Sequence, residues 1–151
     1  MKKSSLTPLE ATIPAEVAAV LDRADADFAS ADEDTRWQAA IAIGAFSETY
    51  PEAIWPLVEK WGSSADEDTR TAIATCVLEH VLEARFQPYF ARTAALINCG
   101  NAFFADTFCG CWKLGEAKEG QNSAKFDRLE KKAYRLRQKA GLGQEPVELP
   151  F

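Results

Sequence analysis

The sequence has few of the features on which enzymes, membrane proteins and secreted domains depend. It contains a single histidine in 151 residues and no Gly-x-Ser-x-Gly, His-Glu-x-x-His or Gly-rich phosphate loop. Its longest unbroken apolar stretch, residues 39–46, is far shorter than the ~18 residues of a membrane span. No apolar segment follows the charged start at Lys2 and Lys3. We therefore expect a cytoplasmic protein without catalytic activity, cofactor or membrane segment.

Cysteine is scarce as well, and its use does not indicate a disulfide framework. The four cysteines, Cys76, Cys99, Cys109 and Cys111, would suit two disulfides in a small secreted domain. Hydrophobic residues make up 47% of the chain, however, which is enough to form a core without covalent cross-links. We expect reduced thiols in a single domain.

Charge is distributed unevenly along the chain. The 17 basic and 23 acidic residues give a net charge of -6, which argues against a nucleic-acid footprint covering the whole domain. Residues 123–140 are the exception, because seven Lys or Arg stand there against two acids, a net charge of +5. Residues 1–122 carry 10 basic and 19 acidic residues, a net charge of -9.

An internal repeat is the strongest signal. The string Ser-Ala-Asp-Glu-Asp-Thr-Arg at residues 30–36 recurs letter for letter at residues 64–70, an offset of 34 positions. A period of ~20–50 residues is typical of stacked repeats. Each copy contains a Ser-x-x-Glu capping box, and its acids complement the positive end of a helix dipole. The repeat predicts two equivalent helices capped by Ser30 and Ser64.

Helical spacing of apolar residues predicts the remaining elements. Pro56 is tolerated in a first turn, so its helix is expected to begin near residues 53–55, and Pro88 is expected to open another helix. Phe104, Phe108, Cys111 and Trp112 predict a packed stripe. The sequence thus predicts an all-α stack of three hairpins at residues 14–49, 51–86 and 88–114, a linker at 115–122, a helix at 123–140 capped by Ser123, and an irregular tail at 141–151.

The pattern Asp-x-x-x-Arg followed by Ala39, Ala40, Ala42, Ile43 and Gly44 resembles the inner-helix signature of HEAT repeats. The second copy keeps Asp66, Arg70, Ile73, Ala74 and Val77. The resemblance covers residues 14–86 and implies an α-α superhelix in which Arg36 pairs with Asp66. It implies a structural ladder made of Asp32, Arg36, Asp66 and Arg70. It also implies a concave scaffold that binds another protein, as an adaptor or an immunity protein does.

A zinc site is the main alternative for the cysteines. Cys76 and His80 are four residues apart on a predicted helix, and Cys109 with Cys111 would complete a Cys3His set. In the register of the repeat, the two helical residues align with apolar residues of the first copy, Ala42 and Phe46. We therefore interpret Cys76 and His80 as packing residues and predict no metal site.

Two kinds of binding surface remain open. Trp55, Tyr89 and Phe103 lie off the apolar stripes and are expected to anchor a protein partner, because Trp and Tyr are enriched at interface hot spots. The alternative is nucleic-acid association through the basic helix, with Lys125, Arg128, Lys132 and Arg135 contacting phosphates. The same basic face could instead dock on the acidic body. Binding of another protein is the main functional prediction.

Overall fold

The computed structural model describes residues 13–142, and this range contains helices and turns without any strand, which confirms the all-α class. None of its helices has the length and apolar character needed to cross a bilayer. The predicted tail lies outside the described residues from position 143 onward. The elements are α2 (Ala15–Phe28), α3 (Glu33–Gly44), α4 (Pro51–Gly62), α5 (Glu67–Ile73), the π-helical turn η1 (Ala74–Leu78), α6 (Glu79–Ala84), α7 (Phe86–Asn98), α8 (Ala102–Cys109), the 3₁₀ turn η2 (Gly115–Lys118) and α9 (Gly120–Lys139).

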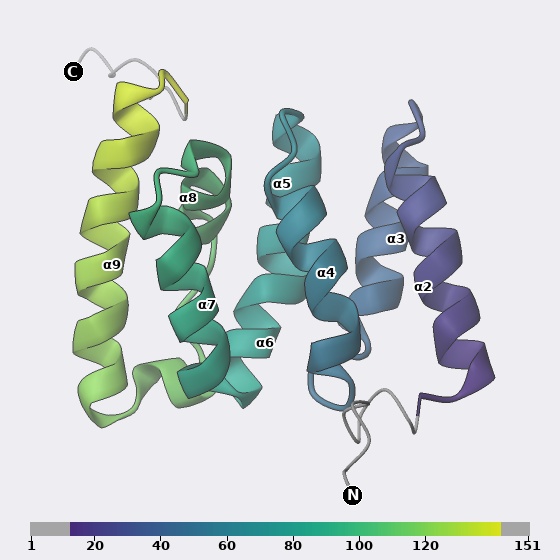
Figure 1. Cartoon of the computed structure of the whole chain (residues 1–151), viewed down its shortest axis with the longest axis horizontal. Helices are drawn as coiled ribbons and strands as arrows, with labels where there is room; N and C mark the ends of the chain where they lie inside the picture. The colour runs from purple at the N-terminus through teal and green to yellow at the C-terminus, as the bar shows by residue number, and fades with distance from the viewer. Residues whose placement is uncertain (1–12, 143–151) are drawn as a thin grey trace, which may run out of the picture.

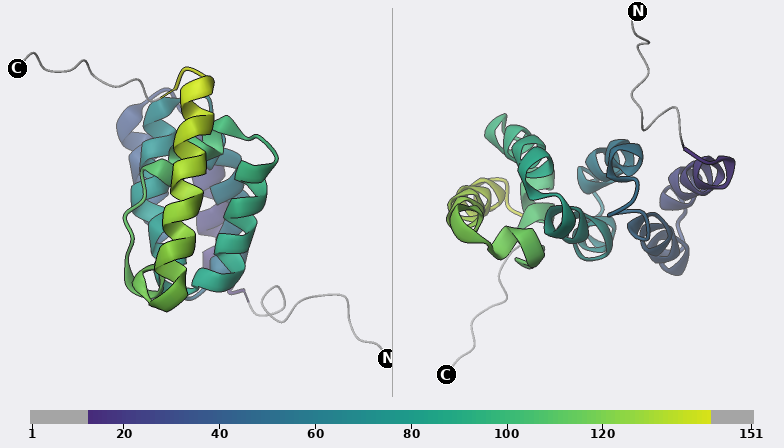
Figure 2. Two further views of the ribbon diagram at one scale, coloured as in Figure 1. Left: turned by 90° about the vertical axis from the view of Figure 1, so that its left-hand side faces the viewer. Right: turned by 90° about the horizontal axis from the view of Figure 1, so that it is seen from below.

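The helices stand side by side in a row, with α2 at one end and α9 at the other (Figure 1). Helix α2 packs on α3, α4 on α5, and α7 on α8. The segment α5, η1 and α6 runs without a break along the chain. The second helix of each pair also contacts the second helix of the next, since α3 packs on α5 and η1, and α5 packs on α8. Figure 2 shows this row from its α9 end and from below.

Aspartates, and not serines, cap the two repeated helices. Asp32 Oδ2 accepts hydrogen bonds from the backbone N of Thr35 at 2.9 Å and from its hydroxyl at 2.7 Å. Asp66 makes the same two bonds in the second copy. Ser30 Oγ accepts only from the N–H of Asp32, at 3.0 Å, so the predicted serine caps are wrong. The aspartate carboxylate caps the helix in preference to the serine hydroxyl because it accepts two hydrogen bonds and also interacts favourably with the helix dipole.

Two proline-containing helices begin earlier than the sequence predicts. Helix α4 begins at Pro51, where a missing N–H costs nothing, and Pro56 lies inside the helix on an exposed side. Helix α7 begins at Phe86, two residues before Pro88. The backbone N of Phe86 donates to Glu116 Oε1 at 2.8 Å, so a side chain from a later element replaces a local cap.

The predicted linker at residues 115–122 is largely helical. It contains η2 and the first turn of α9, which begins at Gly120. Gly120 has φ +46, a conformation that glycine adopts without strain, and Ala117 is buried. Ser123 therefore lies inside α9, where its hydroxyl accepts from Lys113 Nζ at 2.9 Å, and the predicted cap at Ser123 is wrong.

A continuous core runs along the row of helices. It extends from Phe28 of α2 to Phe126 of α9, which stacks obliquely on Phe108 of α8 with ring centroids 4.8 Å apart. Trp112, which the sequence placed on a packed stripe, is 72% exposed. That prediction is wrong for Trp112 because α8 already ends at Cys109, so the helical spacing does not continue; Cys111, on the same predicted stripe, is buried.

The π-helical turn explains one difference between the two copies. Gly44 of α3 faces η1 so closely that a Cβ at this position would collide with the carbonyl oxygen of Cys76. Ser47 Oγ donates to the nearby carbonyl of Val77 at 3.5 Å. The residue equivalent to Gly44 in the second copy is Leu78, which is fully buried. The first copy therefore needs glycine where the second copy needs a large core side chain.

Candidate functional site

The first rung of the expected ladder is present. Arg36 Nε lies 3.7 Å from Asp66 Oδ2, and Arg36 Nη2 lies 3.3 Å from Asp68 Oδ2. Arg36 Nη1 also donates to the carbonyl of Ser30 at 3.0 Å. Asp68 accepts in addition from the indole N–H of Trp37 at 3.0 Å. These contacts therefore connect α3 of the first repeat to the start of α5 in the second repeat.

The second rung has the same form but is more deeply buried. Arg70 Nη1 donates to the carbonyl of Ser64 at 3.0 Å, and Arg70 Nε donates to Asp106 Oδ2 at 2.9 Å. Arg137 Nη1 of α9 donates to Asp106 Oδ1 at 3.0 Å. The side chains of Arg70 and Asp106 are only 4% and 11% exposed. Phe103, a predicted partner anchor, is half-buried beneath the Arg70 guanidinium, 5.0 Å from its ring centroid.

Asp106 does not follow the fixed offset of the repeat. Asp68 stands 32 residues after Arg36, whereas Asp106 stands 36 residues after Arg70. A search at constant spacing therefore finds no acid for the second rung. Asn101 caps α8 as Asp32 and Asp66 cap their helices, but Asp106 lies five residues after this cap, whereas Asp68 lies two residues after Asp66, so the cap alone does not locate the acid.

The other two predicted anchors belong to the core. Trp55 and Tyr89 are each 5% exposed, with ring centroids 5.3 Å apart. Arg92 lies over both rings and pairs with Glu52 at 2.9 Å. Burial, together with the hydrogen bond to Glu52, raises the pKa of the Tyr89 hydroxyl to about 12. The expectation that Trp55 and Tyr89 lie outside the core is wrong, because their rings pack against each other between α4 and α7.

Three of the four cysteines, Cys76, Cys109 and Cys111, occupy packing positions, and Cys99 is exposed. Cys111 is buried, and its thiol donates to the carbonyl of Ala74 at 3.6 Å. Burial raises the pKa of Cys109 to about 12, and it also raises the pKa of Cys76. Over residues 13–142, no three His, Cys, Asp or Glu side chains are grouped in a way that could hold a metal ion.

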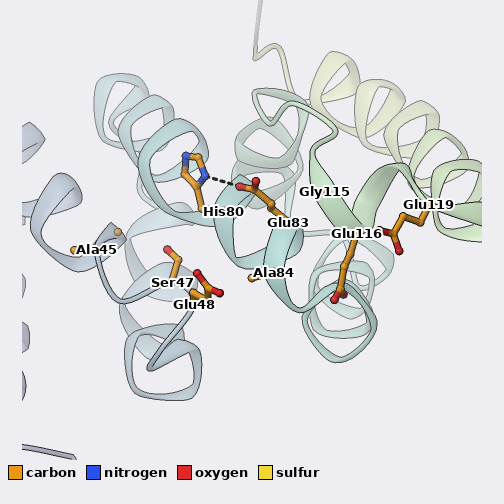
Figure 3. A pocket seen from close by; sticks show the side chains of 10 residues that line it. Ala45, Ser47, Glu48, His80, Glu83, Ala84, Gly115, Glu116 and Glu119 are labelled. Carbon is orange, nitrogen blue, oxygen red and sulfur yellow. Dashed lines mark hydrogen bonds and ion pairs between the residues drawn. The ribbon is translucent and has the colours of Figure 1, made fainter.

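An acidic pocket of about 530 Å³ opens between the end of α3, the helix α6 and the turn η2 (Figure 3). His80 Nδ1 lies 3.0 Å from Glu83 Oε1 on one wall. No Lys or Arg lines the pocket. Its acidic character comes from four glutamates, Glu48, Glu83, Glu116 and Glu119, and His80 also lines it. We call this site the acidic pocket.

The backbone of an exposed tryptophan, Trp112, is linked through Glu79 to the wall of the acidic pocket. The backbone N of Trp112 donates to Glu79 Oε1 at 2.8 Å, and Glu79 Oε2 lies 3.6 Å from His80 Nε2. Glu79, only 8% exposed, thus links Trp112 to the pocket wall. Trp112 is the most exposed large hydrophobic residue in the described part of the chain; the others are Ile41 at 53% and Tyr134 at 45%. Gly110 and Gly115 flank it in sequence and could have indicated a loop.

Together, the acidic pocket and Trp112 suit the recognition of a cation. Carboxylates attract a guanidinium or an ammonium group, and the face of an indole adds a cation–π contact of about 0.5–1 kcal/mol at an exposed site. The described residues place no hydroxyl or thiol within hydrogen-bonding distance of His80, whose partners are Glu79 and Glu83.

The basic residues predicted to contact phosphates share one side of α9. Arg128, Lys132 and Arg135 are exposed, and Lys125 is half-buried. These four side chains make no hydrogen bond or ion pair within residues 13–142. Within the described part of the chain these four cations do not dock on the acidic body, whereas Arg137 of the same helix does pair with Asp106 at 3.0 Å.

No family model, curated protein or solved structure matches this chain. The case for function therefore depends on the surfaces described above. Of these, the acidic pocket with Trp112 and the basic side of α9 are the two that leave charged or aromatic groups open to a partner.

Proposed function

We propose that this chain is a non-catalytic helical-repeat protein of the HEAT type that binds another protein through the acidic pocket and Trp112. The observation that carries the proposal is the 72% exposure of the Trp112 indole, on a residue whose backbone is joined through Glu79 to His80 in the wall of a pocket lined by four glutamates. A large aromatic side chain left in water at such a place is typical of an interface anchor.

The repeated geometry supports the HEAT-type interpretation. Asp32 and Asp66 cap their helices with matching hydrogen bonds, and Arg36 and Arg70 each reach the carbonyl of the serine six residues earlier at 3.0 Å. Equivalent contacts at a spacing of 34 residues are expected of a stack in which each unit packs on the next. Such stacks present surface and use it to bind macromolecules.

The charge of the pocket defines the chemistry of the partner. Four glutamates without a lining Lys or Arg favour a segment rich in arginine or lysine. A volume of about 530 Å³ is within the ~300–1,000 Å³ range of ligand sites. We propose that an arginine of the partner enters the pocket while a neighbouring side chain covers Trp112. An adaptor and an immunity protein would both use such a surface.

Peptide binding tests the proposal. A fluorescent arginine-rich peptide and a glutamate-rich peptide of equal length are titrated against the protein in 50 mM NaCl, with anisotropy as the readout. We expect the arginine peptide alone to bind, and Trp112→Ala and the double variant Glu83→Gln/Glu119→Gln each to weaken binding at least tenfold. Tyr134→Ala, which also removes an exposed aromatic ring, is the matched control and should bind as the wild type does.

Capture of a natural partner completes the test. Wild type and Trp112→Ala are used as bait in lysate of the native host, and the retained proteins are identified by mass spectrometry. We expect a discrete protein with a basic segment that the wild type retains and the variant loses. Equal binding of the arginine peptide by wild type and both variants would refute the proposed surface.

A further inference from the structure

Helix α9 carries a row of cations along the end of the molecule. The left view of Figure 2 shows it lying across this end with its outer side uncovered by any other helix. Lys125, Arg128, Lys132, Arg135 and Lys139 are spaced alternately three and four residues apart, so they share one side of the helix. With a rise of 1.5 Å per residue the row is about 21 Å long. We call these five residues the basic stripe.

The basic stripe has no structural role in the part of the chain that is described. None of its five side chains makes a hydrogen bond, ion pair or ring contact there. Cations elsewhere do have partners, as Lys60 pairs with Asp25 at 3.1 Å and Lys113 with Asp127 at 2.7 Å. The packing of α9 comes from another side of the helix, which buries Phe126, Leu129 and Ala133. Five cations without a partner among residues 13–142 repel one another along the helix, so the row itself does not stabilise α9.

We infer that the basic stripe binds the phosphate backbone of a nucleic-acid duplex. A duplex carries one negative charge per ~1.7 Å of its axis, so the length of about 21 Å beside the stripe holds roughly a dozen phosphates, of which the straight row faces those on one side. Lys and Arg on a rigid helix contact phosphates without reading bases, and the binding is therefore independent of sequence. This site is separate from the acidic pocket and adds a second binding activity to the proposed protein partner.

The surroundings of the stripe disfavour other anionic partners. A membrane-surface helix inserts an apolar face, but the apolar face of α9 is already buried in the protein. Protein interfaces have an apolar centre, and the large hydrophobic residue that α9 exposes, Tyr134, lies under the guanidinium of Arg137 at 4.8 Å. Single strands are held by aromatic stacking platforms, which the stripe lacks.

The acidic body limits how the duplex can lie. Residues 1–122 carry a net charge of -9, and α2, at the far end of the row, is separated from α9 by all the other helices (Figure 1). A duplex held on α9 therefore touches the end of the stack and does not enter it. We expect weak affinity with a steep salt dependence, because each neutralised phosphate contributes about -0.9 to the slope of log K against log salt concentration.

Anisotropy titration of a labelled 20-base-pair DNA duplex tests the inference. The full chain should bind at 50 mM NaCl with a slope of about -3 or steeper. Lys132→Gln/Arg135→Gln should reduce the magnitude of the slope by about 1.8. Raising NaCl from 50 to 200 mM should then weaken binding of the variant by a factor about twelvefold smaller than for the wild type. Arg23→Gln/Lys60→Gln removes the same charge from α2 and α4 and should leave binding unchanged, as should Lys132→Arg/Arg135→Lys. Circular dichroism checks that each variant keeps the wild-type helix content.

Several outcomes would overturn the inference. These are the absence of duplex binding at 50 mM NaCl, equal loss in the α9 and control variants, or tighter binding of a single strand than of the duplex. Equal binding of polyglutamate would indicate an acidic protein as the ligand. Concentration-dependent oligomers that disappear in Lys132→Gln/Arg135→Gln would indicate a second copy of this chain. Trp112→Ala should bind the duplex normally, so failure of the proposed protein-binding surface is distinguishable from failure of this one.

Discussion

Replacing Arg70 with methionine should destabilise the protein much more than the same change at Arg36, although both arginines occupy one position of the repeat. The side chain of Arg70 is 4% exposed and that of its partner Asp106 is 11% exposed. Around Arg36 the corresponding values are 14% and, for Asp68, 30%. Methionine keeps much of the apolar volume of either side chain, so the comparison isolates the ionic and hydrogen-bonding contribution.

The magnitudes follow from this difference in burial. Removing one partner of a buried pair costs about 3–5 kcal/mol, and the lower end applies because Arg137 still pairs with Asp106. Two carbonyls, of Ser64 and Ala65, also lose their donor. We expect a loss of about 3 kcal/mol for Arg70→Met. A surface-type pair contributes about 0–1 kcal/mol, so Arg36→Met should lose about 1 kcal/mol including its bond to the Ser30 carbonyl.

Urea denaturation followed by circular dichroism measures both variants. With a slope of about 1.5–2 kcal/mol/M, the unfolding midpoint should fall by roughly 1.5–2 M for Arg70→Met and by about 0.5 M for Arg36→Met. Both slopes should match that of the wild type, which indicates that the unfolded state is unchanged. Equal losses, or a larger loss at Arg36, would refute the argument that the second rung is the buried one.

Three further predictions concern the core, the thiols and the caps. Gly44→Ala should cost about 1–3 kcal/mol by urea denaturation, because its methyl group meets a backbone carbonyl, and a neutral effect would contradict the close helix contact. Iodoacetamide at pH 8 should modify the exposed Cys99 first and Cys111 last by mass spectrometry, since burial raises the Cys111 pKa; simultaneous labelling would argue against this order. Hydrogen bonds from the Thr69 hydroxyl and amide lower the pKa of Asp66, so its carboxylate stabilises the fold above pH ~4 and this stabilisation is lost as pH falls through the pKa of the folded state. Asp66→Asn should therefore reduce the loss of stability at acid pH, and an unchanged pH profile of stability would refute this role of Asp66.

The repeat allowed much of the fold to be predicted, because local patterns determine where helices lie. The copies at 30–36 and 64–70 correctly indicated two equivalent helix starts and the contact between Arg36 and Asp66. The capping residue was misassigned because serine and aspartate both occur in each copy, and both accept a backbone hydrogen bond. Which of the two caps the helix depends on backbone angles that the pattern does not contain.

The candidate site was less predictable because it depends on contacts between distant segments. Trp55 and Tyr89 lie off the stripe of their own helices but face each other across α4 and α7, and that pairing buries them. The exposure of Trp112 follows from where α8 ends. The acidic pocket joins Glu48 from the turn after α3, Glu83 of α6, and two glutamates in and just after η2; these three segments are far apart in the sequence and have no shared motif.

Helix α9 is a structural part of the stack, and this determines how its function can be tested. Its Arg137 holds the second oxygen of Asp106, so α9 completes the rung that Arg70 begins. Its Phe126 covers Phe108, which would otherwise face water. Deleting residues 120–151 should therefore leave an aggregating protein, as judged by size-exclusion chromatography, and a soluble, cooperatively folded product would show that α9 is an appendage. Because the same helix fixes the core on one side and presents the basic stripe on another, exposed-residue variants can separate binding from folding, whereas truncation cannot.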